Sequence, residues 1–348
     1  MRGQLRSLVK RGLRKVGLLR EPPDVRPIDP SYFPLARPDG ESVSSVVPVS
    51  TVAPFHNSIG DLSTAQITQE FLARSGVPSY LTSFWDHDHE HLVIGGGEIA
   101  GAPLRGAWRY VKPLFLPEGR HVLNAVGVQE NIRNRDLGVL QDYLYVSVRD
   151  HEGAEMLRAS GKVEAAVVPC PATLQHGIPL ELLPSLPRFE RLSDLEVGNY
   201  VVVHKHPTLR SVAQQIARSG HQVVVVDMQA HALHAWGRTG LVVPSTHSPP
   251  VIMGLVRSSM AVITSSLHLA IFALGASIPF VAIDTDDDQS TKVRRYLSRA
   301  GASDCFSKQP SLELALSRQA LVEEVGAKER ERARDHLRKV VASLVAEG

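Results

Sequence analysis

Short, nearly continuous runs of apolar residues alternate with helical patterns along most of this chain. Runs of Val, Ile and Leu that do not alternate with polar residues are typical of parallel strands with helices on both faces. The first series of predicted strands is Val46–Val52, Ser79–Thr82, Leu92–Ile94, Val122–Val126, Leu144–Val148 and Ala165–Val168. The second series is Tyr200–Val203, Val223–Val226, Leu241–Val243, Met260–Ile263 and Phe280–Ile283.

The two series predict an α/β fold of two Rossmann-like domains facing a cleft, and a length of 348 residues suits two domains. A weakly patterned, proline-containing stretch separates the series, and a charged helix from about Leu312 to Val345 closes the chain. The predicted parts are a leader with its proline-rich linker (1–40), an N-terminal domain (41–182), a linker (183–198), a C-terminal domain (199–308) and a C-terminal helix (309–348).

One stretch is long and uncharged enough to suggest a membrane span, because no Asp, Glu, Lys or Arg occurs from Ser258 to Ile283. Hydroxyl residues, a histidine, a glycine and a proline divide this stretch. We therefore predict two buried strands with a buried helix between them, near Leu267 to Leu274.

Composition narrows the class of protein. Hydrophobic residues make up 43% and charged residues 21%, which excludes a largely disordered chain. Lys and Arg number 38 against 36 Asp and Glu, so the small surplus argues against a dedicated nucleic-acid binder. Cys170 and Cys305 cannot build a disulfide framework or a CxxC zinc site, which favours a reducing compartment such as the cytoplasm.

The first twenty residues are basic, and leucines and valines recur among them at helical spacing. The basic residues interrupt any apolar core that a secretory signal would need. Two interpretations stay open: a helix lying on an anionic membrane surface, or a solvated leader helix. The first interpretation predicts peripheral association with the inner membrane face.

In open parallel sheets, ligands bind beyond the carboxyl ends of the strands, so candidate binding and catalytic residues are expected at the strand ends. The first strand leads to Asn57, Gly60 and Asp61. Gly60 permits a close approach, and the new helix can hold an anion or a hydroxyl-rich ligand, unless Asp61 simply caps it. Gly95–Gly97 follows another strand and forms either a sharp turn or a loop close to a ligand or a helix. It is not a GxGxxG fingerprint, which disfavours a nicotinamide dehydrogenase.

Basic residues follow two further strands. Arg149 either points into the cleft, where it could bind carboxylate or phosphate, or pairs with Asp150, which is placed to cap a helix. His204 and Lys205 end the first strand of the second series and suit either an anion-facing or a solvated loop. The imidazoles of His204 and His206 lie on opposite sides of an extended chain, so a zinc site is not expected there.

The segment from Thr264 to His268 is the most informative. Three hydroxyl residues, including Ser265 and Ser266, stand where they could cap the next helix, and His268 falls in its first turn. The positive end of the helix dipole favours a neutral histidine, which suits proton transfer, although a buried core histidine is the alternative. Further on, the clustered acids from Asp284 to Asp288 could hold a divalent ion, but such a run more often forms a solvated loop, which we expect here, with Lys292 and Arg294 after it.

Taken in order, these strand ends resemble the polysaccharide pyruvyl transferase family. The matching elements are Asn57–Asp61, Ile94–Gly97, Ser147–Asp150, the Pro171–Ala172 pair, Ile263–His268, Ile278–Ile283 and Lys292–Arg295. The family often has an arginine where this chain has Ser266, and an aspartate where it has Cys170.

The resemblance implies a fold similar to glycosyltransferase type B and transfer of pyruvate from phosphoenolpyruvate onto two sugar hydroxyls, giving a cyclic ketal and phosphate in cell-envelope polysaccharide biosynthesis. It implies a catalytic role for His268. Donor-binding candidates are Arg149, His204, Lys205, Ser265, Ser266 and Lys292, and residues lining the sugar or loop side are Asn57, Gly60, Asp61, Gly95, Gly96 and Gly97. We expect no metal and no cofactor besides the co-substrate phosphoenolpyruvate. The expected partner is a sugar acceptor, which the basic leader suggests is lipid-linked.

Two other functions remain open: a type-B nucleotide-sugar glycosyltransferase, and a non-catalytic sugar-binding descendant of the family. The sequence offers no acidic residue clearly placed for a ribose, which counts against the first.

Overall fold

The computed structural model describes residues 49–53, 58–83, 91–100, 120–128, 137–186, 188–228, 236, 239–243, 248–285 and 288–345. The predictions for the basic leader, Asn57, Asp286 and Asp287 lie outside these residues.

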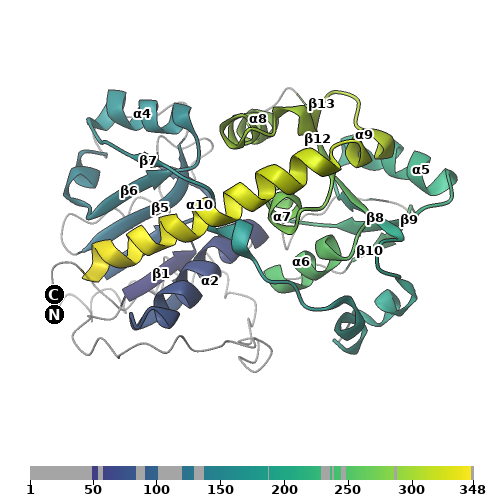
Figure 1. The fold of residues 1–348 in the computed structure, drawn as a ribbon, viewed down its shortest axis with the longest axis horizontal. Helices are drawn as coiled ribbons and strands as arrows, with labels where there is room; N and C mark the ends of the chain where they lie inside the picture. Colours follow the sequence, from purple (N-terminus) through teal and green to yellow (C-terminus); the bar gives the residue numbers. More distant parts are fainter. Residues whose placement is uncertain are drawn as a thin grey trace, which may run out of the picture. The chain divides into compact units, whose positions relative to one another are not determined.

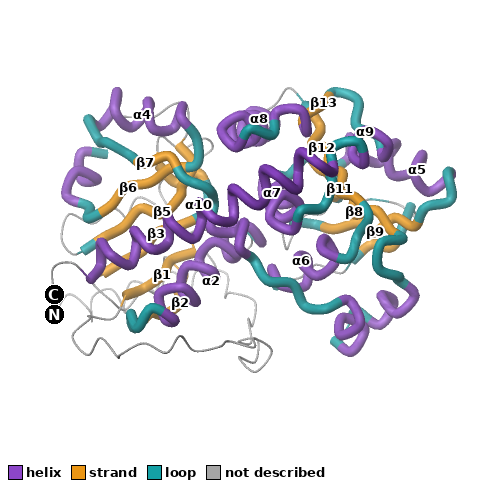
Figure 2. The backbone as a smooth tube through the Cα atoms, viewed as in Figure 1, coloured by secondary structure: helices purple, strands orange, loops and turns teal. Residues whose placement is uncertain are grey.

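The first sheet is parallel and has the strand order β2-β1-β3-β5-β6-β7 (Figures 1 and 2). Its strands are β1 (Val49–Ala53), β2 (Ser79–Ser83), β3 (His91–Gly95), β5 (His121–Val128), β6 (Tyr145–Val148) and β7 (Ala166–Val167), and β4 (Glu98–Ala100) pairs with β5. Two helices join its strands, α2 (Ile59–Arg74) and α4 (His151–Gly161). All eight residues of β5 are buried, as expected for a central strand with apolar residues on both faces.

The second sheet is also parallel, in the order β10-β9-β8-β11-β12-β13. Its strands are β8 (Tyr200–His204), β9 (Gln222–Val226), β10 (Leu241–Val242), β11 (Ala261–Thr264), β12 (Phe280–Ile283) and β13 (Phe306–Ser307). Its helices are α5 (Arg210–Arg218), α6 (Pro249–Arg257), α7 (Leu267–Ala276) and α8 (Asp288–Ala300). Figure 2 shows strands and helices alternating through both halves, which confirms the two Rossmann-like domains.

Every predicted strand is present, and the differences concern short elements. The strands β4 and β13 were not predicted, because three and two residues leave no apolar run to recognise. The single predicted C-terminal helix is two helices, α9 (Leu312–Leu316) and α10 (Gln319–Val345). The break is a tight turn, in which the backbone N–H of Arg318 donates to the carbonyl of Ala315.

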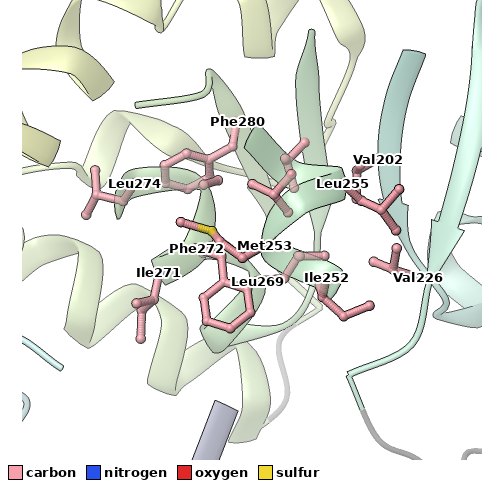
Figure 3. Packing of buried hydrophobic residues seen from close by; sticks show 14 of the residues in the cluster. Val202, Val226, Ile252, Met253, Leu255, Leu269, Ile271, Phe272, Leu274 and Phe280 are labelled. Atoms are coloured by element: carbon pink, nitrogen blue, oxygen red, sulfur yellow. The ribbon is translucent and has the colours of Figure 1, made fainter. Parts of the chain in front are cut away.

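The uncharged segment is folded into the core of the second domain. It forms β11, α7 and β12, as predicted, and eight of the ten residues of α7 are buried. A helix that is apolar all round belongs inside a protein, and Figure 3 shows Phe272 of α7 packed among Met253, Leu269 and other buried side chains. Within the ranges described above, no helix is both long and apolar enough to span a membrane.

The last helix packs against the cores of both domains. Val322 and Val325 of α10 belong to the large core that contains α7, whereas Val340 and Leu344 belong to a cluster beneath the first sheet. Between these positions, Nε2 of His336 lies 2.6 Å from Oδ1 of Asn124 in β5. The chain therefore returns to its first domain, and α10 connects the two halves (Figure 1).

Candidate active site

The helix that follows β1 begins at Ile59 and is capped by Ser58, whose Oγ accepts a hydrogen bond from the backbone N–H of Asp61 at 3.4 Å. Asp61 therefore lies inside the helix, and the interpretation of Asp61 as its cap is wrong. Serine three residues before an acid is itself a capping signal, and here it leaves the Asp61 carboxylate available for other contacts. The N–H of Ile59 donates to the carbonyl of Met228 just after β9, which joins the strand ends of the two domains.

Gly60 brings the two domains into direct contact, because the imidazole of His268 lies against its backbone. A Cβ atom at position 60 would lie 1.8 Å from Cγ and 2.0 Å from Nδ1 of His268. Since atoms that are not bonded to each other cannot approach so closely, only glycine fits while the imidazole keeps this position. His268, predicted from the second domain, thus meets the first turn of α2 from the first domain.

The three glycines after β3 form a turn that packs on the same part of α2. Gly96 and Gly97 have φ values of 78° and 68°, and a Cβ atom on Gly96 would lie 2.8 Å from Cα of Asp61. The Asp61 carboxylate accepts hydrogen bonds from the Gly97 backbone N–H and the Ser58 hydroxyl. For the segment Gly95–Gly97, the sequence left open a sharp turn or a loop close to a ligand or a helix. The structure shows a turn that lies close to the helix α2.

Arg149 is buried behind this turn. Its residue surface is 3% exposed, and Nη2 donates to the carbonyl of Gly97 at 3.3 Å. Asp150 caps α4 by accepting from the Gly153 N–H at 2.8 Å, so the local Arg149–Asp150 pair is not formed. Nε and Nη1 of Arg149 are buried and have no hydrogen-bond partner among the described residues. A buried guanidinium with two unused donors is a group suited to an anionic ligand.

The hydroxyl residues before α7 do not cap it as predicted, because no side chain makes a cap hydrogen bond at this helix start. Thr264 Oγ1 instead accepts from the backbone N–H of Ser266 at 2.8 Å. Ser265 Oγ lies 2.8 Å from Nδ1 of His204, at the end of the neighbouring strand. Ser266 is 6% exposed and stands directly before the helix.

Asp61 and His268 have strongly shifted pKa values. Burial raises the pKa of Asp61 to about 6, although Arg149 and the hydrogen bond from Gly97 pull it downward. Burial, followed by the charges of Arg149 and Lys292, lowers the pKa of His268 to about 3. His268 is thus neutral, as predicted, but burial and two cations explain this rather than the helix dipole alone.

Asp61 and His268 face each other without a direct hydrogen bond. Asp61 Oδ1 and His268 Nε2 lie 3.9 Å apart, and neither atom has a hydrogen-bond partner among the described residues. Because His268 is neutral, the two groups are not an ion pair. Unsatisfied buried polar atoms destabilise a fold by about 1 to 3 kcal/mol each, so their concentration beside Arg149 indicates a site for a polar ligand.

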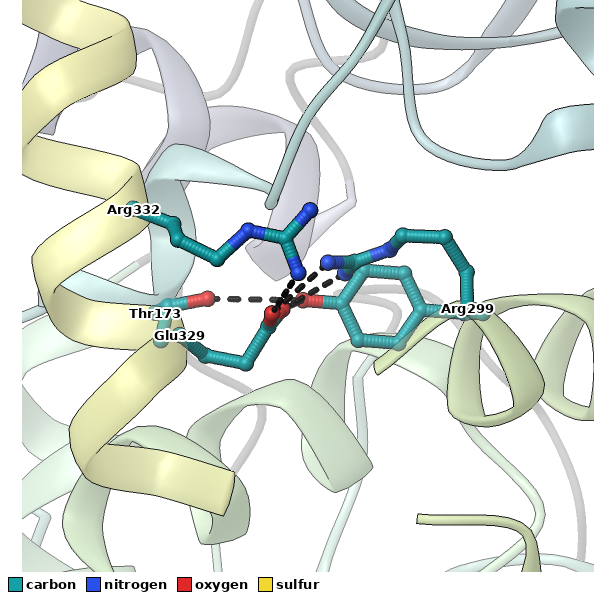
Figure 4. Close-up of polar contacts among 5 residues, drawn as sticks. Thr173, Arg299, Glu329 and Arg332 are labelled. Carbon is teal, nitrogen blue, oxygen red and sulfur yellow. Dashed lines mark hydrogen bonds and ion pairs between the residues drawn. The ribbon is translucent and has the colours of Figure 1, made fainter. Parts of the chain in front are cut away.

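Lys292 acts on this site from α8, where its charge lowers the pKa values of both Asp61 and His268. A buried ion pair fixes α8 to α10 near its other end. The guanidinium of Arg299 donates to both carboxylate oxygens of Glu329 at 2.7 and 2.6 Å, and Arg332 adds a contact of 3.3 Å (Figure 4). Because this guanidinium is bidentate, it holds α8 in one orientation.

The other predicted residues have different surroundings. Lys205 Nζ lies 3.4 Å from Oδ2 of Asp227. The prediction that the imidazoles of His204 and His206 lie on opposite sides of the chain is wrong: they are stacked, with ring centroids 6.1 Å apart, because residues two apart in an extended segment share a face. Neither His204 nor Lys205 contributes a charge to the pKa shift of His268. In the part of the chain that the structure describes, no group of three or more His, Cys, Asp and Glu side chains could hold a metal ion.

Cys170 lies beside the site, beneath α2. It is fully buried, and Sγ lies 3.2 Å from the hydroxyl of Thr64. Burial raises the pKa of this thiol, whereas Arg149 lowers it. Cys170 is therefore a packed neutral group at the position where the resemblance leads one to expect an acid.

Two parallel α/β domains, with polar side chains from both meeting at their strand ends, define a two-domain Rossmann-like protein. The model of the polysaccharide pyruvyl transferase family matches residues 58–287, which include both sides of this site. The chain belongs to the polysaccharide pyruvyl transferase family.

Several solved structures are similar to this chain at low sequence identity, and the first of those described here supports the fold. A proposed UDP-N-acetylglucosamine 2-epimerase from Listeria monocytogenes is 12% identical, with a TM-score of 0.51 over 86% of this chain and 96% of that chain. UDP-GlcNAc 2-epimerase from Methanocaldococcus jannaschii is 10% identical, with a TM-score of 0.49 over 84% and 98%. An uncharacterised protein from Klebsiella pneumoniae is 12% identical, with a TM-score of 0.48 over 76% and 93%. No curated protein matches the sequence.

Proposed function

We propose that this protein transfers the pyruvyl group of phosphoenolpyruvate onto two hydroxyls of a sugar in a polysaccharide or glycolipid, forming a cyclic ketal and releasing phosphate. Family membership supports polysaccharide pyruvylation in general. The observation that carries the finer proposal is the unsatisfied buried cluster of Arg149, Asp61 and His268 at the meeting of the two domains. A donor with a carboxylate and a phosphate would supply acceptors for the free donors of Arg149.

The proposed reaction needs one proton to reach carbon and one to reach phosphate. The first sugar hydroxyl bonds to C2 of phosphoenolpyruvate and loses its proton, while the methylene carbon gains a proton and becomes a methyl group. The C2–O bond to phosphate then breaks. The second hydroxyl bonds to C2, and its proton leaves with phosphate. Two C–O bonds form and one breaks, with no change of oxidation state that would require a redox partner.

His268 and Asp61 are the groups that we assign to these proton transfers. The pKa of His268 is about 3 because burial and two cations disfavour its charged form. An anionic donor bound to Arg149 and Lys292 would offset those cations and raise the pKa of His268, which would then deliver the proton to the methylene carbon. Asp61, with a pKa of about 6, would accept a proton from the sugar hydroxyl near neutral pH.

Phosphate release from phosphoenolpyruvate in the presence of a panel of glycans tests the proposal. We expect His268→Asn and Arg149→Met to abolish release. The matched controls are His151→Asn, an exposed histidine at the start of α4, and Arg158→Met, an exposed arginine that pairs with Glu164. We expect both controls to keep activity.

Three outcomes would contradict the proposal. The first is no phosphate release with any acceptor, and the second is full activity of His268→Asn. The third is a rise in melting temperature with UDP that Arg149→Met removes, with no rise with phosphoenolpyruvate, which would favour a nucleotide-sugar glycosyltransferase. Donor binding without turnover would favour a non-catalytic descendant, in which case Ser266→Arg would test whether the arginine common in the family restores activity.

We further propose that the acceptor is lipid-linked and that the basic leader holds the protein at the inner membrane face. The sequence of this leader, in which Lys and Arg alternate with leucines and valines, suits an anionic surface. Deleting the residues before Pro22 should move the protein from the membrane to the soluble fraction while leaving phosphate release from a soluble acceptor unchanged. Unaltered membrane fractionation would contradict this part of the proposal.

A further inference from the structure

A cavity of about 260 Å³ lies at the far ends of the helices that begin at the candidate active site. Its walls come from the C-terminal halves of α2, α6 and α7 and from the side of α10, helices that can be followed in Figure 2. Four arginines line it: Arg74, Arg257, Arg330 and Arg334. Its apolar wall consists of Ile67, Phe71 and Leu174.

This cavity is separate from the active site. Asp61 and Glu70 lie nine positions apart on α2, and a rise of about 1.5 Å per residue places them roughly 14 Å apart along its axis. On α7, His268 is in the first turn, whereas Gly275 lines the cavity at the other end. The two helices thus carry active-site residues at their N-terminal ends and cavity residues towards their C-terminal ends.

The positive charge of the cavity is only partly balanced. Arg330 is held by hydrogen bonds from Nη1 to the carbonyl of Gly275 at 2.8 Å and to Ser277 Oγ at 2.9 Å. The side chains of Arg74, Arg257 and Arg334 make no hydrogen bond to any residue that the structure describes, and Nε of Arg74 is buried. Glu70 is the one acidic residue among those lining the cavity, and its interaction is with Arg74.

The four guanidiniums are close enough to act on the same groups. The pKa of Arg330 is lowered by burial and then by the charges of Arg334 and Arg257. The pKa of His176, at the cavity wall, is lowered by desolvation and then by Arg74, Arg257 and Arg334, although much of its surface is exposed. Like charges that converge in this way repel one another, and a bound anion would relieve the repulsion.

Stabilisation of helix ends explains only part of this arrangement. Arg74 and Arg257 lie in the last turns of α2 and α6, where a cation interacts favourably with the helix dipole. Arg330 and Arg334, however, stand four residues apart in the middle of α10, a spacing at which like charges destabilise a helix. The position of both arginines on one face of α10 does not stabilise this helix, and binding of an anionic ligand explains it better.

We propose that this cavity binds a diphosphate group. Three or four guanidiniums around one small space suit a compact anion with several oxygens, because each guanidinium can donate two parallel hydrogen bonds. The volume is below the roughly 300 to 1,000 Å³ of sites for drug-sized ligands, which fits a diphosphate rather than a whole nucleotide sugar. The apolar wall would contact the first part of an ester attached to it.

Calorimetric titration at fixed ionic strength tests this proposal with inorganic pyrophosphate, UDP, geranyl diphosphate and sulfate. We expect pyrophosphate to bind at least ten-fold more tightly than sulfate. Arg257→Ser and Arg334→Ser should each weaken pyrophosphate binding at least ten-fold. Both side chains are exposed, so these changes should leave the fold intact. The control Arg338→Ser, an exposed α10 arginine paired with Asp335 and not among the cavity residues, should leave the Kd unchanged.

The active site itself attracts anions, so a second comparison separates the two sites. Pyrophosphate binding should persist in Arg149→Met, whereas phosphoenolpyruvate turnover should persist in Arg257→Ser and Arg334→Ser. Tighter binding of UDP or of geranyl diphosphate than of pyrophosphate would identify a soluble nucleotide or a lipid as the source of the diphosphate. Loss of pyrophosphate binding in Arg149→Met, an unchanged Kd in both cavity variants, or affinity equal to that of sulfate would overturn the proposal.

Discussion

Replacing Asp61 with asparagine should stabilise the protein increasingly as the pH rises. Asp61 is buried against His268 and the turn formed by Gly96 and Gly97, and burial raises its pKa to about 6. The folded state therefore binds this proton more tightly than the unfolded state does, where the pKa is 3.8. The stability that the protonated carboxyl of Asp61 contributes is fully present below about pH 4 and is lost as the pH rises through about 6.

The size of the effect follows from the two pKa values. Between 3.8 and about 6, at about 1.4 kcal/mol per pH unit, ionisation of Asp61 reduces the free energy of unfolding by about 3 kcal/mol. Asparagine has nearly the same shape, can still accept from the Gly97 N–H, and does not ionise. The advantage of the variant over the wild type should therefore grow by roughly 2 to 3 kcal/mol from pH 4 to pH 7.

Urea unfolding of both proteins at closely spaced pH values measures this difference. His268→Asn is the comparison of opposite sign, because the pKa of His268 falls from 6.5 to about 3 on folding. Stability from the neutral imidazole is present above pH 6.5 and is lost as the pH falls towards 3, so this variant should gain on the wild type at acid pH. A constant difference between Asp61→Asn and the wild type from pH 4 to pH 7 would refute the reasoning.

Three further predictions concern packing and backbone conformation. Gly60→Ala should abolish phosphate release, because its Cβ would displace His268, and should destabilise the fold by about 1 to 3 kcal/mol through overpacking; unaltered kcat would contradict it. Glu329→Gln leaves the buried guanidinium of Arg299 without its countercharge and should destabilise the protein by about 3 to 5 kcal/mol in urea unfolding, whereas Arg299→Met with Glu329→Leu should recover most of this loss. Lys162→Gly should stabilise by up to about 1 kcal/mol, because Lys162 ends α4 with φ at 54°; a loss of thermal stability would contradict it.

Hydrophobic patterning was sufficient to predict the long elements, because each central strand is buried on both faces and shows this as an unbroken apolar run. The same argument identified α7, which is apolar all round, as a buried helix. It could not predict β4 or β13, which are held by pairing with β5 and β12 rather than by their own residues. The break between α9 and α10 was missed because a turn at Ser317 and Arg318 leaves the amphipathic pattern uninterrupted.

The sequence by itself determined the two-domain α/β class and the strand ends where Arg149 and His268 would stand, because parallel sheets bury their strands and expose chemistry at their carboxyl ends. Only the tertiary structure decided that Asp61 faces His268. Ser58 caps α2, so the carboxylate of Asp61 is not used as the helix cap. The tertiary structure also decided that arginines far apart in the sequence, such as Arg74 and Arg334, line one cavity. Periodicity describes which face of an element is buried, whereas the partner of a buried charge depends on which elements pack together, and that is fixed only when the whole chain folds.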